Sequence, residues 1–125
     1  MYIKDKLTEN DYQDIAKLMR SLMIKWKRKS NNKVVKEISM PDMIDILCNT
    51  QITNYNITWC IDDYWVRIME ERDEEIDSKI FEILKNNMST IYELSNCGGF
   101  TQNELQWIIN NYIKDIPVIY IKEEN

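Results

Sequence analysis

Histidine is absent from the 125-residue chain, and cysteine, glycine and proline are scarce. Without an imidazole, the chain has no Ser-His-Asp or Cys-His nucleophile system and no histidine ligand for zinc catalysis. A structural zinc site needs four ligands, and the three cysteines, Cys48, Cys60 and Cys97, are too few and too widely spaced to supply them. We therefore expect no metal centre, and we interpret the cysteines as reduced thiols of a cytoplasmic protein.

The two glycines, Gly98 and Gly99, are adjacent. A glycine-rich phosphate-binding loop needs several spaced glycines, so the common nucleotide-dependent enzymes are not expected. The longest purely apolar run, residues 116–121, is far too short to span a membrane. Charged residues within the first nine positions are not typical of a signal peptide. These absences predict a protein that is not an enzyme, takes no cofactor and does not enter a membrane.

The net charge of −5 is unevenly distributed. Residues 1–40 carry ten Lys and Arg against five Asp and Glu, whereas residues 41–125 carry six against sixteen. Within the first part, residues 17–36 contain eight basic side chains and no acidic one. The chain therefore has a basic front and an acidic remainder, which either pair with each other or contact partners of opposite charge.

The first periodic segment, residues 8–29, is predicted to be one amphipathic helix. Thr8 is a suitable N-cap, and Asp11 stands at the position of a capping box. At about 100° per residue, the basic side chains of the segment lie opposite its apolar side chains. The apolar stripe comprises Tyr12, Ile15, Met19, Leu22 and Trp26.

An internal similarity appears when residues 40–68 are aligned with residues 88–116. Six positions are identical, including Trp59 with Trp107 and Thr53 with Thr101. Each copy predicts a short helix, a break and then a longer helix. In the second copy a capping box and a hydrophobic staple mark the start of the long helix; these pairs are Thr101 with Glu104 and Phe100 with Leu105.

A further helix precedes each copy, at residues 8–29 and at about 74–86, so each unit has the helix, short helix, turn, helix order of a helix-turn-helix motif. The expected fold is mainly α: two tandem trihelical units packed as one small domain, followed by a short C-terminal β-strand. Residues 1–69 would hold the basic helix and the first unit. Residues 70–125 would hold an acidic connector, the second unit and the strand.

The tryptophan of each long helix lies roughly 200° from the centre of its apolar stripe. Trp59 and Trp107 should therefore point away from their own units, with Val66 projecting near Trp59. An exposed indole is costly unless something covers it. The cover could be the other unit, a second copy of the chain, or an outside partner, because tryptophan is enriched at interface hot spots.

Residues 69–77 carry six acids and one arginine. This segment could be a solvated connector, could pair with the basic face, or could dock on a basic groove of another protein. Paired carboxylates can catalyse proton transfer, but a charge run without a pocket does not favour it. The predicted protein interface comprises Trp59, Asp62, Asp63, Val66, Glu70, Glu71, Glu74, Glu75 and Trp107.

An alternative is a helix-turn-helix regulator that binds nucleic acid. Amide side chains on the last long helix could read adenine edges, but that helix has no Lys or Arg before Lys114, and phosphate contacts supply most of the affinity. Only the basic residues of segment 17–36 could supply the missing phosphate contacts. The residues for this alternative are Lys17, Arg20, Lys25, Lys27, Arg28, Lys29, Gln102, Asn103, Gln106 and Asn110.

The sequence thus favours a non-catalytic protein that docks on another protein as a small acidic inhibitor or adaptor. The composition, rich in Ile and Asn and poor in Gly, is typical of an AT-rich genome such as that of a virus, phage or mobile element. Nucleic-acid binding is the alternative, and a structural or assembly subunit that forms a homodimer through its tryptophans is the second alternative.

Overall fold

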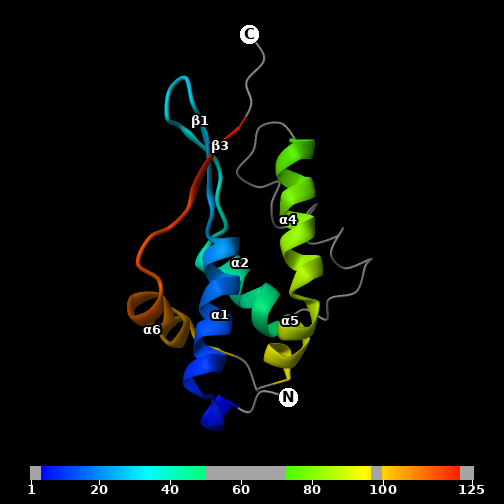
Figure 1. The fold of residues 1–125 in the computed structure, drawn as a ribbon, viewed down its shortest axis with the longest axis vertical. Coiled ribbons are helices and arrows are strands. Elements are labelled where there is room, and N and C mark those ends of the chain that lie inside the picture. Colours follow the sequence, from blue (N-terminus) through cyan, green and yellow to red (C-terminus); the bar gives the residue numbers. More distant parts are fainter. Residues whose placement is uncertain (1–3, 50–72, 97–99, 122–125) are drawn as a thin grey trace.

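The computed structural model describes residues 4–49, 73–96 and 100–121. The helices and strands of these residues are shown in Figure 1. In chain order they are η1 (Lys4–Lys6), α1 (Glu9–Leu22), β1 (Lys25–Arg28), β2 (Val34–Lys36), α2 (Met40–Ile44), the π-helical turn η2 (Asp45–Asn49), α4 (Glu74–Asn86), α5 (Met88–Ser95), α6 (Gln102–Tyr112) and β3 (Val118–Ile121).

The expected fold class is wrong, because the described part of the chain contains a three-stranded sheet and not a single C-terminal strand. The strand order is β2-β1-β3. β1 and β2 form an antiparallel hairpin, whereas β1 and β3 pair in parallel, with Lys25 opposite Val118 and Arg28 opposite Ile121. The predicted C-terminal strand exists, but its partner is a segment that the sequence assigned to a helix.

The end of α1 explains this error. The predicted helix over 8–29 stops at Leu22, and residues 25–28 are extended. A helical stripe and a strand alternation both place Trp26 inside, with its lysine neighbours outside, and Trp26 is indeed buried, whereas Lys25 and Lys27 are half-buried. The local pattern therefore could not distinguish the two states, and in the folded chain residues 25–28 pair as a strand with both β2 and β3.

Local capping signals were confirmed at two helix starts. The Thr8 side chain accepts a hydrogen bond from the Asp11 N–H, and the Asp11 carboxylate accepts one from the Thr8 N–H. Thr101 and Glu104 make the same reciprocal pair at α6. These contacts satisfy N–H groups that a helix leaves unpaired at its first turn.

α4, α5 and α6 follow the order predicted for the second unit, and the staple residues Phe100 and Leu105 are both buried. α6 ends at Tyr112, before the end of the aligned segment 88–116, and Ile116 lies exposed in the connection to β3. The long helix of the first unit, including Trp59, lies outside the described residues, as does most of the first copy of the internal similarity.

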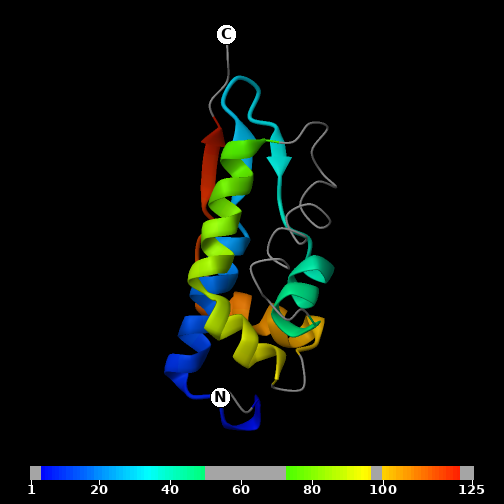
Figure 2. The same cartoon turned by 90° about the vertical axis from the view of Figure 1, so that its right-hand side faces the viewer.

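One apolar core joins elements from both predicted ranges, 1–69 and 70–125. Buried side chains of α1, α2, η2, α4, α5 and α6 belong to a single cluster. α1 and α4 run along the long axis of the molecule, with the sheet toward one end and α6 toward the other (Figures 1 and 2). The core therefore holds α1, which continues into β1, against the helices of the second unit.

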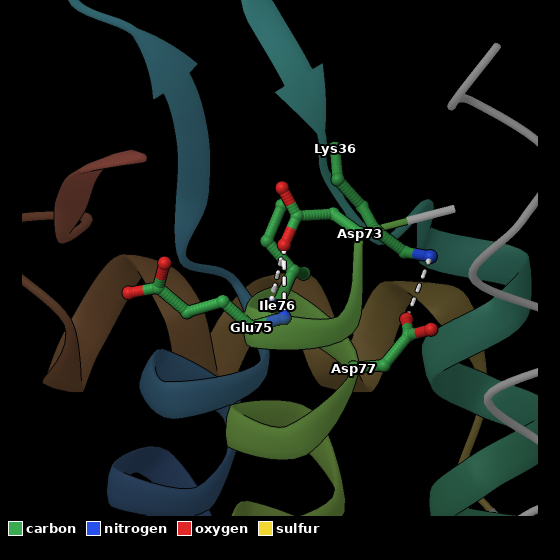
Figure 3. Close-up of polar contacts among 5 residues, drawn as sticks. All are labelled: Lys36, Asp73, Glu75, Ile76 and Asp77. Atoms are coloured by element: carbon green, nitrogen blue, oxygen red, sulfur yellow. Dashed lines mark hydrogen bonds and ion pairs between the residues drawn. The ribbon is translucent and has the colours of Figure 1, made fainter. Parts of the chain in front are cut away.

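A buried ion pair connects the sheet to α4. Lys36 Nζ on β2 lies 4.0 Å from Asp77 Oδ1 in the first turn of α4, and the lysine is only 1% exposed (Figure 3). Asp73, the residue directly before α4, caps this helix, because its side chain accepts hydrogen bonds from the N–H groups of Glu75 and Ile76. The start of α4 is thus fixed both to its own backbone and to the sheet.

Candidate protein-binding surface

Three aromatic rings from two helices meet where α1 packs against α6. Tyr12 on α1 contacts Trp107 on α6 edge-on, with 5.4 Å between ring centroids and 67° between planes. Tyr12 also stacks on Tyr112 at 5.8 Å and 14°, and the Trp107 and Tyr112 rings lie 6.0 Å apart. We call Tyr12, Trp107 and Tyr112 the aromatic cluster.

The positions of residues around the axis of α6 explain why Trp107 is partly exposed. Leu105 and Ile108 are buried on the inner face of the helix. Trp107 lies on the other side and is 49% exposed. Its indole rests on two tyrosines, so its orientation is fixed by aromatic contacts although half of its surface faces solvent.

A hydrogen bond holds the far end of the cluster. The Tyr112 hydroxyl donates to Glu9 Oε2 across 2.8 Å. This bond raises the pKa of Tyr112 above its ordinary value of 10.0, because the carboxylate stabilises the protonated phenol; desolvation and the negative charge of Glu9 act in the same direction. Glu9 therefore ties the first turn of α1 to the last turn of α6.

We expect Glu9→Gln to lower the pKa of Tyr112, because an amide oxygen accepts a weaker hydrogen bond and carries no charge. A pH titration of ring-labelled tyrosine by NMR, with Tyr112→Phe to assign the signal, measures the shift. Since the folded-state pKa is raised, the contribution of this bond to stability is present below pH 10 and is lost as the pH rises through the pKa of Tyr112. An unchanged pKa in Glu9→Gln would show that the bond does not form in solution.

Two hollows flank the aromatic cluster along the junction of α1 and α6. The first has a volume of about 390 Å³ and is lined by Asp5, Tyr12, Phe100, Asn103, Glu104, Trp107 and Ile108. The second has a volume of about 400 Å³ and is lined by Glu9, Gln13, Ala16, Lys17, Arg20, Asn111 and Tyr112. The first hollow has two acidic side chains on its rim, whereas the second carries one acid and two bases.

The surface offers ring faces, an indole N–H, amides and carboxylates beside two hollows. Such groups suit recognition of another macromolecule, because aromatic rings bury a large area with little loss of side-chain freedom. Among the described residues, no group of three or more Cys, Asp or Glu side chains is placed to hold a metal ion. None of the helices within 4–49, 73–96 and 100–121 is long and apolar enough to cross a membrane.

The residues of the predicted protein interface are not all gathered at this surface. Trp107 belongs to it, but Glu74 and Glu75 lie exposed in the first turn of α4, which is at the sheet end of the molecule (Figure 1). Glu75 forms an exposed ion pair with Lys79 at 3.9 Å. The other residues of that set, Trp59, Asp62, Asp63, Val66, Glu70 and Glu71, lie outside the described residues.

The residues of the nucleic-acid alternative separate into three places. Lys17 and Arg20 lie exposed on α1, where the Arg20 side chain donates a hydrogen bond to the Asp115 carbonyl oxygen. Lys25, Lys27, Arg28 and Lys29 do not share the helix predicted for them but lie on the β1–β2 hairpin. The amide side chains Gln102, Asn103, Gln106 and Asn110 are exposed on α6.

The sequence did not predict Tyr12 and Tyr112 as partners of Trp107, or Glu9 as the hydrogen-bond partner of Tyr112. Both tyrosines recur at helical spacing with the apolar residues of their helices, a pattern that predicts core positions, and both are half-buried. A signal was present in their hydroxyl groups, because a tyrosine at the edge of a stripe commonly keeps its polar end at the surface. Their mutual contact joins helices at opposite ends of the sequence, so it left no local signal.

Comparisons of the chain with protein-family models, with curated proteins and with solved structures found no match.

Proposed function

We propose that the protein is a non-catalytic binding module, a small cytoplasmic inhibitor or adaptor, whose protein partner docks over the aromatic cluster. The observation that carries this proposal is the state of Trp107: it is 49% exposed, yet its ring is held by Tyr12 and Tyr112 and lines the first hollow. An indole fixed before binding loses little entropy when a partner covers it, which favours affinity.

The groups around the aromatic cluster favour a partner that presents both apolar and basic side chains. An apolar side chain of the partner would cover the indole, and a basic side chain would reach the rim formed by Asp5 and Glu104. Opposite charges at a rim contribute more to orientation and association rate than to affinity. We therefore place most of the binding free energy on the rings and assign the carboxylates to selection of the partner.

The test compares two aromatic residues of similar exposure. Trp107 lies in the cluster, whereas Tyr92 on α5 is 54% exposed and lies outside it. We expect Trp107→Ala to weaken the complex by about 2 kcal/mol or more, a loss of about 30-fold, because it removes a central anchor. Tyr92→Ala should leave the affinity within a few-fold of the wild type.

The partner is first isolated from the native host by affinity capture and identified by mass spectrometry, and the dissociation constants are then measured by calorimetry. Equal losses for Trp107→Ala and Tyr92→Ala would remove the cluster from the interface. Sedimentation of the protein alone tests the assembly alternative, because a dimer that Trp107→Ala dissociates would make the cluster a contact between copies of this chain.

The contribution of the acidic side chains in the first turn of α4 is measured in the same assay with the variant Glu74→Lys/Glu75→Lys. We expect this double charge reversal to weaken the complex less than Trp107→Ala does, because exposed ion pairs contribute about 0–1 kcal/mol each. A larger effect of the charge reversal would transfer the main contact to the first turn of α4.

A further inference from the structure

The β1–β2 hairpin concentrates positive charge at the end of the molecule opposite α6 (Figure 1). Residues 25–36 contain six Lys and Arg and no Asp or Glu. Lys36 is turned inward to Asp77, which leaves five basic side chains for the surface of the hairpin. Of these, Arg28, Lys29 and Lys33 are exposed, and Lys25 and Lys27 are half-buried.

The strand alternation gives this hairpin an outer face. Trp26 and Lys36 are directly opposite each other and both are buried, so their side chains lie on the inner face. Lys25 and Lys27 therefore lie on the outer face. β3 continues that face, because Val118 is opposite Lys25 and Tyr120 is opposite Lys27.

The aromatic residue on this outer face is exposed and held in place. Tyr120 is 51% exposed, and its hydroxyl donates a hydrogen bond to Asn32 Oδ1 across 3.0 Å. Asn32 has a φ of 57°, a left-handed conformation that asparagine tolerates at turns. The turn is further closed by bonds from the Lys33 N–H to Asn31 Oδ1 and from the Arg28 N–H to the Lys33 carbonyl oxygen.

We propose that the outer face of the sheet and the hairpin turn bind single-stranded nucleic acid, with a base stacked on Tyr120 and phosphates at the basic side chains. A single strand offers both groups at once, because its bases are accessible for stacking and its backbone is anionic. A duplex presents phosphates but keeps its base faces inside, so it would leave the Tyr120 ring unused.

The net negative charge of the chain does not prevent this contact. At physiological salt the interaction between exposed charges is largely screened beyond about 8 Å. The charges close to the hairpin therefore determine whether an anionic strand is attracted or repelled. Glu37 follows β2 directly and is exposed, and it opposes binding. Glu74 at the start of α4 is also exposed and opposes binding. Glu75 beside it forms an ion pair with Lys79, and Asp77 lies beside Lys36. Among the described residues, the five surface cations of the hairpin therefore outnumber the carboxylates of Glu37 and Glu74.

The phosphate contacts are tested by fluorescence anisotropy with labelled oligothymidylate over a series of salt concentrations. For a single strand, each phosphate that the protein neutralises adds about 0.7 to the steepness of log affinity against log salt. Arg28→Gln/Lys29→Gln/Lys33→Gln should therefore lower that slope by about two. The control Lys6→Gln/Lys85→Gln/Lys114→Gln removes the same charge from exposed positions elsewhere and should leave the slope unchanged.

The ring is tested by two substitutions of Tyr120. Tyr120→Leu should reduce the affinity about tenfold, because it removes a stacking surface, whereas Tyr120→Phe should stay close to the wild type. Circular dichroism verifies that each variant is folded.

The proposal is overturned if both triple variants lose affinity equally, if Tyr120→Leu binds like the wild type, or if a blunt duplex or anionic vesicles bind as tightly as the single strand. Because Trp107 lies outside this face, Trp107→Ala should bind oligothymidylate normally, whatever its effect on the protein partner.

Discussion

Lys36→Met is expected to lower the free energy of unfolding by about 3–5 kcal/mol, the usual cost of removing one member of a buried ion pair. The lysine is 1% exposed, and its ammonium lies 4.0 Å from Asp77 Oδ1. The substitution keeps a long apolar side chain in place but leaves the carboxylate of Asp77 in the interior without this cation. The loss is therefore electrostatic and does not arise from a cavity.

Urea unfolding measured by circular dichroism gives this free energy. Lys79→Met is the matched control, because Lys79 forms an exposed ion pair with Glu75 and should cost less than about 1 kcal/mol. The double variant Lys36→Met/Asp77→Leu should recover part of the loss, since it removes the charge left behind. Equal effects of the two Lys→Met substitutions would show that the Lys36–Asp77 pair is not buried in solution.

Trp26→Ala should lower the free energy of unfolding by a similar amount, about 3–5 kcal/mol, through loss of buried surface and formation of a cavity. Trp26 is 3% exposed, and on β1 it is opposite Lys36 on one side and Ile119 on the other. Its loss removes a large apolar contact of the sheet with the core, to which Ile121 on β3 also belongs. Lys79 also lies over its ring, with 5.8 Å from Nζ to the ring centroid.

Trp107→Ala is the matched control for stability, because the same side chain is removed from a half-exposed position. Its edge-on contacts with two tyrosines contribute about 0.5–1.5 kcal/mol each at most, so the expected cost is clearly smaller than for Trp26→Ala. Both values come from urea unfolding. If Trp107→Ala destabilised the protein as much as Trp26→Ala, the aromatic cluster would belong to the core and could not serve primarily as a docking surface.

The two proposed surfaces lie apart along the long axis, with the hairpin at one end and α6 in the other half of the molecule (Figures 1 and 2). The aromatic cluster at the junction of α1 and α6 has acids on the rim of one hollow, whereas the hairpin is basic. A protein partner and a single-stranded nucleic acid could therefore occupy the molecule together. The variants at Trp107 and at Tyr120 separate the two activities, because neither side chain belongs to the other surface.

Trp107 and Trp26 differ in how well their surroundings follow from the sequence. The position of Trp107 relative to the apolar stripe predicted an outward indole, and the ring is half exposed. The same reasoning placed Trp26 on the inner side of a helix. The side chain is buried, but it lies on a strand. Over so short a segment, the helical and the strand periodicity both predict an inward position for Trp26.

Local residue patterns were enough to predict where α1 and α6 begin, because an N-cap or a staple joins residues a few positions apart. Thr8 with Asp11 and Thr101 with Glu104 are such pairs. The extended state of residues 25–28 follows instead from pairing in the folded chain. The N–H and C=O groups of a strand find no partner within the strand itself. Those of residues 25–28 pair with β2, a few residues later, and with β3, about ninety residues later. A similar separation lies between Tyr12 and Trp107, which is why the aromatic cluster became visible only in the folded chain.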